Sequence, residues 1–161
     1  MASASRDIDR VSAYSQSLDE AVEEVFSLMM GLHCIPVSEC PIEERETISA
    51  VIGLAGAMSG TCVLRSGEQV ALCMAENLIG IEMPGLSDTV KDAVGEICNM
   101  VTGAWKSKQL PLASGCMLST PTVVTGTHYH LHTQKPEFRI ERYYRFDARS
   151  FGVALVCESM Q

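Results

Sequence analysis

Short connections between apolar segments constrain the fold of this 161-residue chain more than any other feature. The runs "TISAVIGLAG" and "SGTCVLRS" have the composition of β-strands and are separated only by the few residues around 57–60. In the last third of the chain, "GCMLSTPTVVTG" is followed closely by "THYHLHT", and "EFRIERYYRF" is followed closely by "SFGVALVCES". Because parallel strands need a crossover of about a dozen residues or more, these short connections predict antiparallel pairs.

Three other segments repeat their apolar residues with the period of a helix. The first starts after a candidate N-cap at Ser17, and the second ends at Gly80. The third covers 87–109, with Ser87 or Thr89 as its N-cap.

The order helix, hairpin, helix, helix and then strands predicts an α+β fold. In this fold an antiparallel β-sheet is packed on one face by two long helices and a shorter one. Residues 1–13 are small and polar, and we expect them to form a partly disordered N-terminal segment. We expect residues 14–161 to form a single domain.

The composition excludes several classes of partner. Twenty acidic and twelve basic residues give a net charge of −8, which repels phosphate backbones, so we expect no nucleic-acid partner. The first residues lack the apolar region of a signal peptide, and no apolar run is long enough to span a bilayer. The seven cysteines are odd in number and form no CxxC pair, which favours a reducing compartment. We therefore expect a cytoplasmic protein without membrane insertion.

The long helix carries a stripe of polar and small residues within "DAVGEICNMVTGAW". At about 100° per residue, four positions fall within roughly 60° of one another: Asp92, Glu96, Asn99 and Gly103. Gly95 lies beside this stripe, and each interior glycine costs about 1 kcal/mol relative to alanine. Such a cost fits a helix that another surface approaches closely. The same polar pattern is also typical of ordinary exposed positions on an amphipathic helix.

The D-x-x-x-E-x-x-N spacing of Asp92, Glu96 and Asn99 resembles the signature helix of the CheC/CheX/FliY family. The preceding "GLAGAMSGTCVLRSGEQVALCMAENLIG" is similar to the hairpin and helix of that family, so that the resemblance covers residues 15–158. The members are phosphatases of the chemotaxis response regulator. The resemblance therefore implies an enzyme that removes phosphate from the aspartyl phosphate of a CheY-like receiver domain.

The resemblance also implies a role for each polar residue of the stripe. Asn99 would position the attacking water, and Glu96 would pair with a lysine of the receiver. The partner would supply Mg²⁺, and we expect this chain to bind no metal or cofactor of its own. Asp92 would either contact the partner or support the helix electrostatically, and Gly95 and Gly103 would provide clearance for the partner at the same surface. The alternative is a non-catalytic CheX-like module that binds a receiver domain or a motility-switch component through the same stripe.

Some members of the family carry the signature on two helices. In the first helix of this chain, Asp19, Glu23 and Phe26 repeat the spacing, but phenylalanine cannot orient a water molecule. If the repeat reflects duplication, we expect one working site and Phe26 in the core. This pattern resembles the CheX-type branch, which implies a homodimer.

Three histidines form a second candidate site. In a strand, His128, His130 and His132 would lie on one face and could bind a transition metal. A surface strand tolerates histidine equally well, and no carboxylate or cysteine stands nearby in the sequence. We therefore predict no metal site at these histidines.

Overall fold

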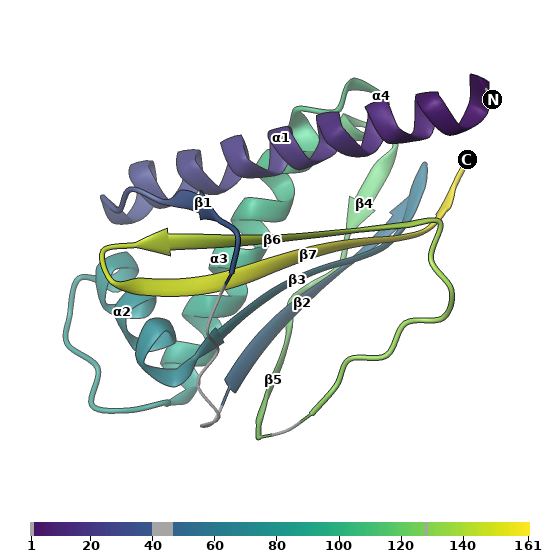
Figure 1. Ribbon diagram of the computed structural model, residues 1–161. Helices are drawn as coiled ribbons and strands as arrows, with labels where there is room; N and C mark the ends of the chain where they lie inside the picture. Colours follow the sequence, from purple (N-terminus) through teal and green to yellow (C-terminus); the bar gives the residue numbers. More distant parts are fainter. Residues whose placement is uncertain (1, 40–46, 128) are drawn as a thin grey trace.

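The computed structural model describes residues 2–39, 47–127 and 129–161, and it contains helices and strands in the order expected of an α+β chain (Figure 1). The helices are α1 (Ala2–Met30), α2 (Glu68–Ile79), α3 (Asp88–Ser107) and the short α4 (Leu110–Ala113). The strands are β1 (Ile35–Val37), β2 (Thr47–Gly56), β3 (Met58–Gly67), β4 (Cys116–Leu118), β5 (Thr122–Gly126), β6 (Phe138–Phe146) and β7 (Arg149–Met160).

The strands form one antiparallel sheet in the order β1-β6-β7-β3-β2-β4, with β5 also paired to β2. The β2–β3 and β6–β7 hairpins are those predicted from the short connections. In the second hairpin Phe146 pairs with Arg149, so that only Asp147 and Ala148 form the turn. Asp147 has a φ of 51°, in the left-handed region that aspartate enters more readily than most residues.

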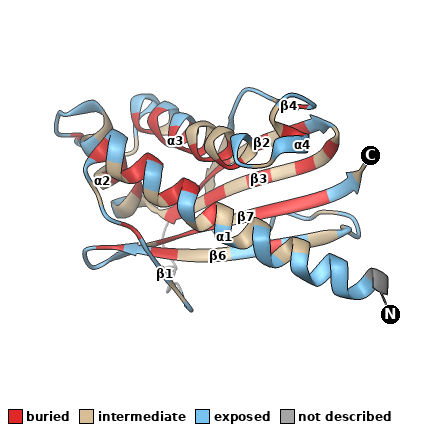
Figure 2. Ribbon diagram, turned by 90° about the horizontal axis from the view of Figure 1, so that it is seen from above, coloured by how far each residue is buried: buried red, intermediate tan, exposed pale blue. Residues whose placement is uncertain are grey.

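The helices α1, α2 and α3 lie on one face of the sheet, which confirms the predicted layer arrangement (Figures 1 and 2). Alternate residues of the central strands point into this layer, as in β3, where Cys62 and Leu64 are buried. Trp105 of α3 is fully buried there and donates a hydrogen bond from Nε1 to the carbonyl oxygen of Tyr14 at 3.2 Å. The core therefore fixes α3 against both the sheet and α1. None of the described helices is both long and apolar enough to cross a bilayer.

The first helix begins much earlier than predicted. It starts at Ala2, and the hydroxyl of Ser17 donates to the carbonyl oxygen of Ala13 within the helix, so Ser17 is not an N-cap. Residues 2–13, for which partial disorder was expected, form the first turns of this helix. Val11 and Tyr14 are half-buried and pack against the core, and this tertiary contact overrides the polar local composition.

The region after α3 also differs from the prediction. The single strand expected over 115–126 is divided into β4 and β5 around Pro121, because proline cannot donate to a strand ladder. Residues 129–133, expected to form a strand, have no regular secondary structure. In the segment 35–46, expected to be a loop, Ile35–Val37 form an edge strand, while residues 40–46 lie outside the described part of the chain.

Candidate functional site

Helix α3 is a rigid support for the polar stripe because its N-terminus is capped locally and its opposite side is buried. The hydroxyl of Ser87 accepts a hydrogen bond from the backbone N–H of Val90 at 3.4 Å, which identifies Ser87 as the N-cap. The preceding helix ends at Gly80, whose φ of 84° suits a glycine C-cap. Val94, Ile97 and other apolar residues of α3 are fully buried.

The predicted stripe lies on the open side of α3. Asp92 and Glu96 are exposed, and Asn99 is half-buried. Within the described residues, none of these three side chains makes a hydrogen bond or an ion pair. Glu96 and Asn99 stand three positions apart on the helix and are therefore surface neighbours. The carboxylate and the amide are thus available together for an external ligand.

Gly95 requires a correction, because its open side is filled by this chain. Gly95 is buried, and a Cβ added there would lie 3.2 Å from Cβ of Pro121 and 3.4 Å from Cγ2 of Val123. The close approach predicted from this glycine is therefore made by Pro121, which lies between β4 and β5, and by Val123 of β5, so that Gly95 offers no surface to a partner. Gly103 is half-exposed, and the nearest atom to its added Cβ is Cδ1 of Leu118 at 4.0 Å.

This packing predicts that Gly95→Val destabilises the protein more than Gly103→Val. Valine adds the same side chain to the same helix in both variants, but only at position 95 does it collide with a neighbouring segment. Overpacking of this kind costs about 1–3 kcal/mol. Urea unfolding followed by circular dichroism measures the difference. Equal free energies of unfolding for the two variants would contradict the close contact between Gly95 and Pro121.

The neighbours of the stripe have structural roles. Lys106 donates from Nζ to the carbonyl oxygen of Cys116 at 2.6 Å and so ties α3 to β4. Cys98 is fully buried, and its hydrogen bond with Cys62 together with burial raises the pKa of its thiol. A protonated, inaccessible thiol is a poor nucleophile, so Cys98 takes part in packing and not in chemistry.

On α1, the residues that repeat the D-x-x-x-E-x-x-N spacing make contacts within this chain. Both carboxylate oxygens of Asp19 accept from Arg142, at 2.9 and 2.6 Å, and Oδ1 also accepts from the hydroxyl of Tyr144. Glu23 accepts from the backbone N–H of Cys34 at 3.0 Å. Phe26 is fully buried, which confirms its predicted place in the core. This second set of residues therefore serves packing, and the exposed set on α3 is the candidate site.

The shared face considered for the three histidines required a strand, and the described residues 129–133 do not form one. His130 and His132 are exposed in the irregular segment 129–133, whereas His128 lies outside the described residues. The described part of the chain contains no group of three or more histidine, cysteine, aspartate or glutamate residues placed to hold a metal ion. Alternation along a strand therefore gives no reason to place His130 and His132 on one face.

A model of the family described as "Chemotaxis phosphatase CheX" matches residues 48–141, which is more than half of the chain and includes the whole of α3. The chain belongs to the CheX family. The match runs from β2 into β6 and therefore includes the segment that packs on Gly95.

Solved structures agree with this assignment. The CheX protein of Vibrio vulnificus is 25% identical and superimposes with a TM-score of 0.77, covering 90% of this chain and 96% of that one. A CheX–CheY–BeF3–Mg complex from Borrelia burgdorferi contains a chain with the same fold, at 17% identity and a TM-score of 0.71, covering 91% of this chain and 98% of that one. These superpositions confirm the predicted CheC-like α+β fold.

A curated relative is the "CheY-P phosphatase CheX" of Thermotoga maritima. It is 28% identical over 92 residues, which represent 56% of this chain and 59% of the relative. The matched region thus spans less than two thirds of that protein.

Proposed function

We propose that this protein is a phosphatase that hydrolyses the aspartyl phosphate of a CheY-like receiver domain. The observation that carries the proposal is the pair of exposed Glu96 and half-buried Asn99 on α3 of a CheX-family chain, both free of internal hydrogen bonds among the described residues. The name of the Thermotoga maritima relative supports the same reaction, and the Borrelia burgdorferi complex supports a CheY-like partner.

Asn99 has the chemistry needed to position the attacking water. Its amide oxygen can accept a hydrogen bond from water, and its amide nitrogen can donate to a phosphoryl oxygen. Because phosphoryl transfer depends mainly on positioning and electrostatic stabilisation, a neutral amide assists without adding negative charge next to the phosphoryl group.

Glu96 would bind the cationic part of the receiver site, a lysine beside the phosphorylated aspartate. This ion pair would align α3 one turn away from the water that Asn99 holds. The partner would hold Mg²⁺, which would neutralise charge on the phosphoryl oxygens. The proposed reaction does not require this chain to coordinate the metal ion. Asp92 and Gly103, on the same stripe, would contact the receiver surface.

The test is loss of aspartyl phosphate from a phosphorylated CheY-like receiver with Mg²⁺, measured with and without this protein. We expect acceleration by the wild type and at least a tenfold loss of that acceleration in Glu96→Ala and in Asn99→Ala, because an oriented charged contact or donor contributes about 2–4 kcal/mol to a transition state. Glu20→Ala and Asn77→Ala alter exposed helix residues away from the stripe and serve as matched controls.

Equal decay with the wild type, Glu96→Ala and Asn99→Ala would contradict the catalytic assignment. Saturable binding of the receiver without faster decay would instead select the non-catalytic binding module. The homodimer and the cytoplasmic location stay predictions, and sedimentation of the purified protein tests the first of them.

A further inference from the structure

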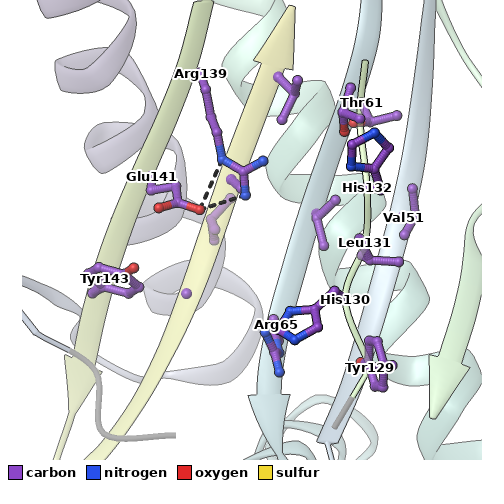
Figure 3. A pocket seen from close by; sticks show the side chains of 16 residues that line it. Val51, Thr61, Arg65, Tyr129, His130, Leu131, His132, Arg139, Glu141 and Tyr143 are labelled. Carbon is purple, nitrogen blue, oxygen red and sulfur yellow. Dashed lines mark hydrogen bonds and ion pairs between the residues drawn. The ribbon is translucent and has the colours of Figure 1, made fainter. Parts of the chain in front are cut away.

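A cavity of about 530 Å³ lies on the face of the sheet that the helices leave uncovered (Figure 3). Strands β2, β3, β6 and β7 form its floor, and the segment 129–133 crosses over one side. This volume falls within the range of about 300–1,000 Å³ that is typical of small-molecule sites. The cavity is separated from the stripe on α3 by the sheet itself, so it is independent of the proposed phosphatase site.

The floor of the cavity is apolar. Val51, Val63, Ala154 and Val156 line it, because they are the outward-facing members of alternating strand residues. An apolar floor of this kind on the open face of a sheet can bury the hydrocarbon or aromatic part of a ligand.

The side walls carry positive charge. Two arginines and one glutamate line the cavity, a formal charge of +1 with neutral histidines, in a chain with a net charge of −8. Arg139 donates to Glu141 from Nε and Nη2, at 3.0 and 2.6 Å, so its charge is already paired. Arg65 makes no ion pair within the described residues.

Arg65 is held in place by an aromatic side chain. Its guanidinium lies over the ring of Tyr129, 5.4 Å from the ring centroid, and the hydroxyl of Tyr129 is hydrogen-bonded to that of Ser49 at 2.6 Å. Arg65 and His130 both line the cavity (Figure 3). The Tyr129–Ser49 contact therefore fixes the cation against the sheet.

The Nε of Arg65 is the unexplained feature of this cluster. It is buried, and it finds no hydrogen-bond acceptor in the described part of the chain. A buried charged donor without an acceptor is costly, and most such groups in native proteins are paired. The other guanidinium nitrogens of Arg65 also make no hydrogen bond among the described residues, and they are not buried. An oxyanion in the cavity would supply acceptors to these nitrogens, and guanidinium groups bind carboxylates and phosphates in two-point geometry.

We propose that this cavity binds a small amphipathic anion, with a carboxylate or phosphate group at Arg65 and a flat apolar body on the floor formed by Val63 and Ala154. His130, which also lines the cavity and follows Tyr129 in the chain, supplies a further nitrogen for polar contact with the ligand. The proposal assigns binding only and includes no reaction.

The experiment is isothermal titration of the full chain with three probes that share one ring system: 2-naphthoate, 2-naphthyl phosphate and the neutral 2-naphthol. We expect saturable one-site binding of at least one anion, with 2-naphthol at least about tenfold weaker, because a charge-assisted hydrogen bond contributes about 1.5–3 kcal/mol. The anion that binds with the higher affinity identifies the head group, carboxylate or phosphate. Equal affinity for 2-naphthol, or no binding of either anion at millimolar concentration, would overturn the proposal.

Two variants separate the charge from the floor. Arg65→Gln should weaken the anion at least about tenfold and leave 2-naphthol unchanged, whereas Arg149→Gln, an exposed arginine outside the cavity, should have no effect. Ala154→Leu fills the floor without changing charge and should abolish binding of all three probes. Circular dichroism verifies that each variant is folded. Wild-type affinity in folded Arg65→Gln, or in folded Ala154→Leu, would contradict the assignment.

Discussion

Replacing Asn99 with aspartate is expected to reduce the acceleration of receiver dephosphorylation at least about 100-fold, the loss typical when one positioned hydrogen-bond donor is removed from a transition state. Aspartate has nearly the size and shape of asparagine, so the substitution tests the chemistry of the group and not its volume. The ionised carboxylate has no N–H to donate and places negative charge beside the phosphoryl oxygens. The half-buried Asn99 makes no hydrogen bond with the described residues, so the fold has no need of its amide.

The measurement is the first-order decay of the phosphorylated receiver, from which the decay of the receiver alone is subtracted. Asn99→Asp should be no more active than Asn99→Ala, because alanine only removes the amide, whereas aspartate also adds repulsion. Asn77→Asp, on the exposed side of α2, is the matched control and should retain wild-type activity. Activity of Asn99→Asp within about threefold of the wild type, a difference below 1 kcal/mol, would rule out the amide as the water-positioning group.

Where the determinants are local, the sequence predicted the structure closely. Gly80 was predicted as the end of one helix, and Ser87 was one of the two N-caps predicted for the next, because each acts on the backbone of its own helix. The exposed stripe on α3 followed from helical period alone. The two hairpins followed from chain connectivity, since strands joined by short turns can hardly pair otherwise.

Where the structure depends on contacts between segments far apart in the sequence, the sequence either did not predict those contacts or predicted different ones. The packing of Pro121 on Gly95 joins residues that no periodicity connects, although proline within a predicted strand was a signal that the strand is interrupted there. The length of α1 depends on the core that it meets. The cavity beside Arg65 was missed because it is assembled from four strands and an irregular segment.

Replacing Phe26 with alanine is expected to lower the free energy of unfolding by about 3–5 kcal/mol, the usual cost of deleting a buried aromatic side chain. Phe26 is fully buried, and its ring stacks on that of Phe151 with centroids 4.8 Å apart and planes 8° apart. Phe146 packs on the same ring, at a centroid distance of 6.0 Å. Because β6 and β7 contribute these partners, the loss would loosen the contact of α1 with the sheet.

Urea unfolding of the wild type, Phe26→Ala and Leu28→Ala measures this effect within a single helix. Leu28 is 75% exposed, so its replacement should change the free energy of unfolding by no more than about 0.5 kcal/mol. Dephosphorylation by Phe26→Ala, under conditions in which it remains folded, should equal that of the wild type, because the proposed site lies on α3. If Phe26→Ala were as stable as Leu28→Ala but inactive, position 26 would belong to a working site and not to the core. The engagement of Asp19 with Arg142 and Tyr144 argues for the core, since a carboxylate held by three internal hydrogen bonds is not free to meet a partner.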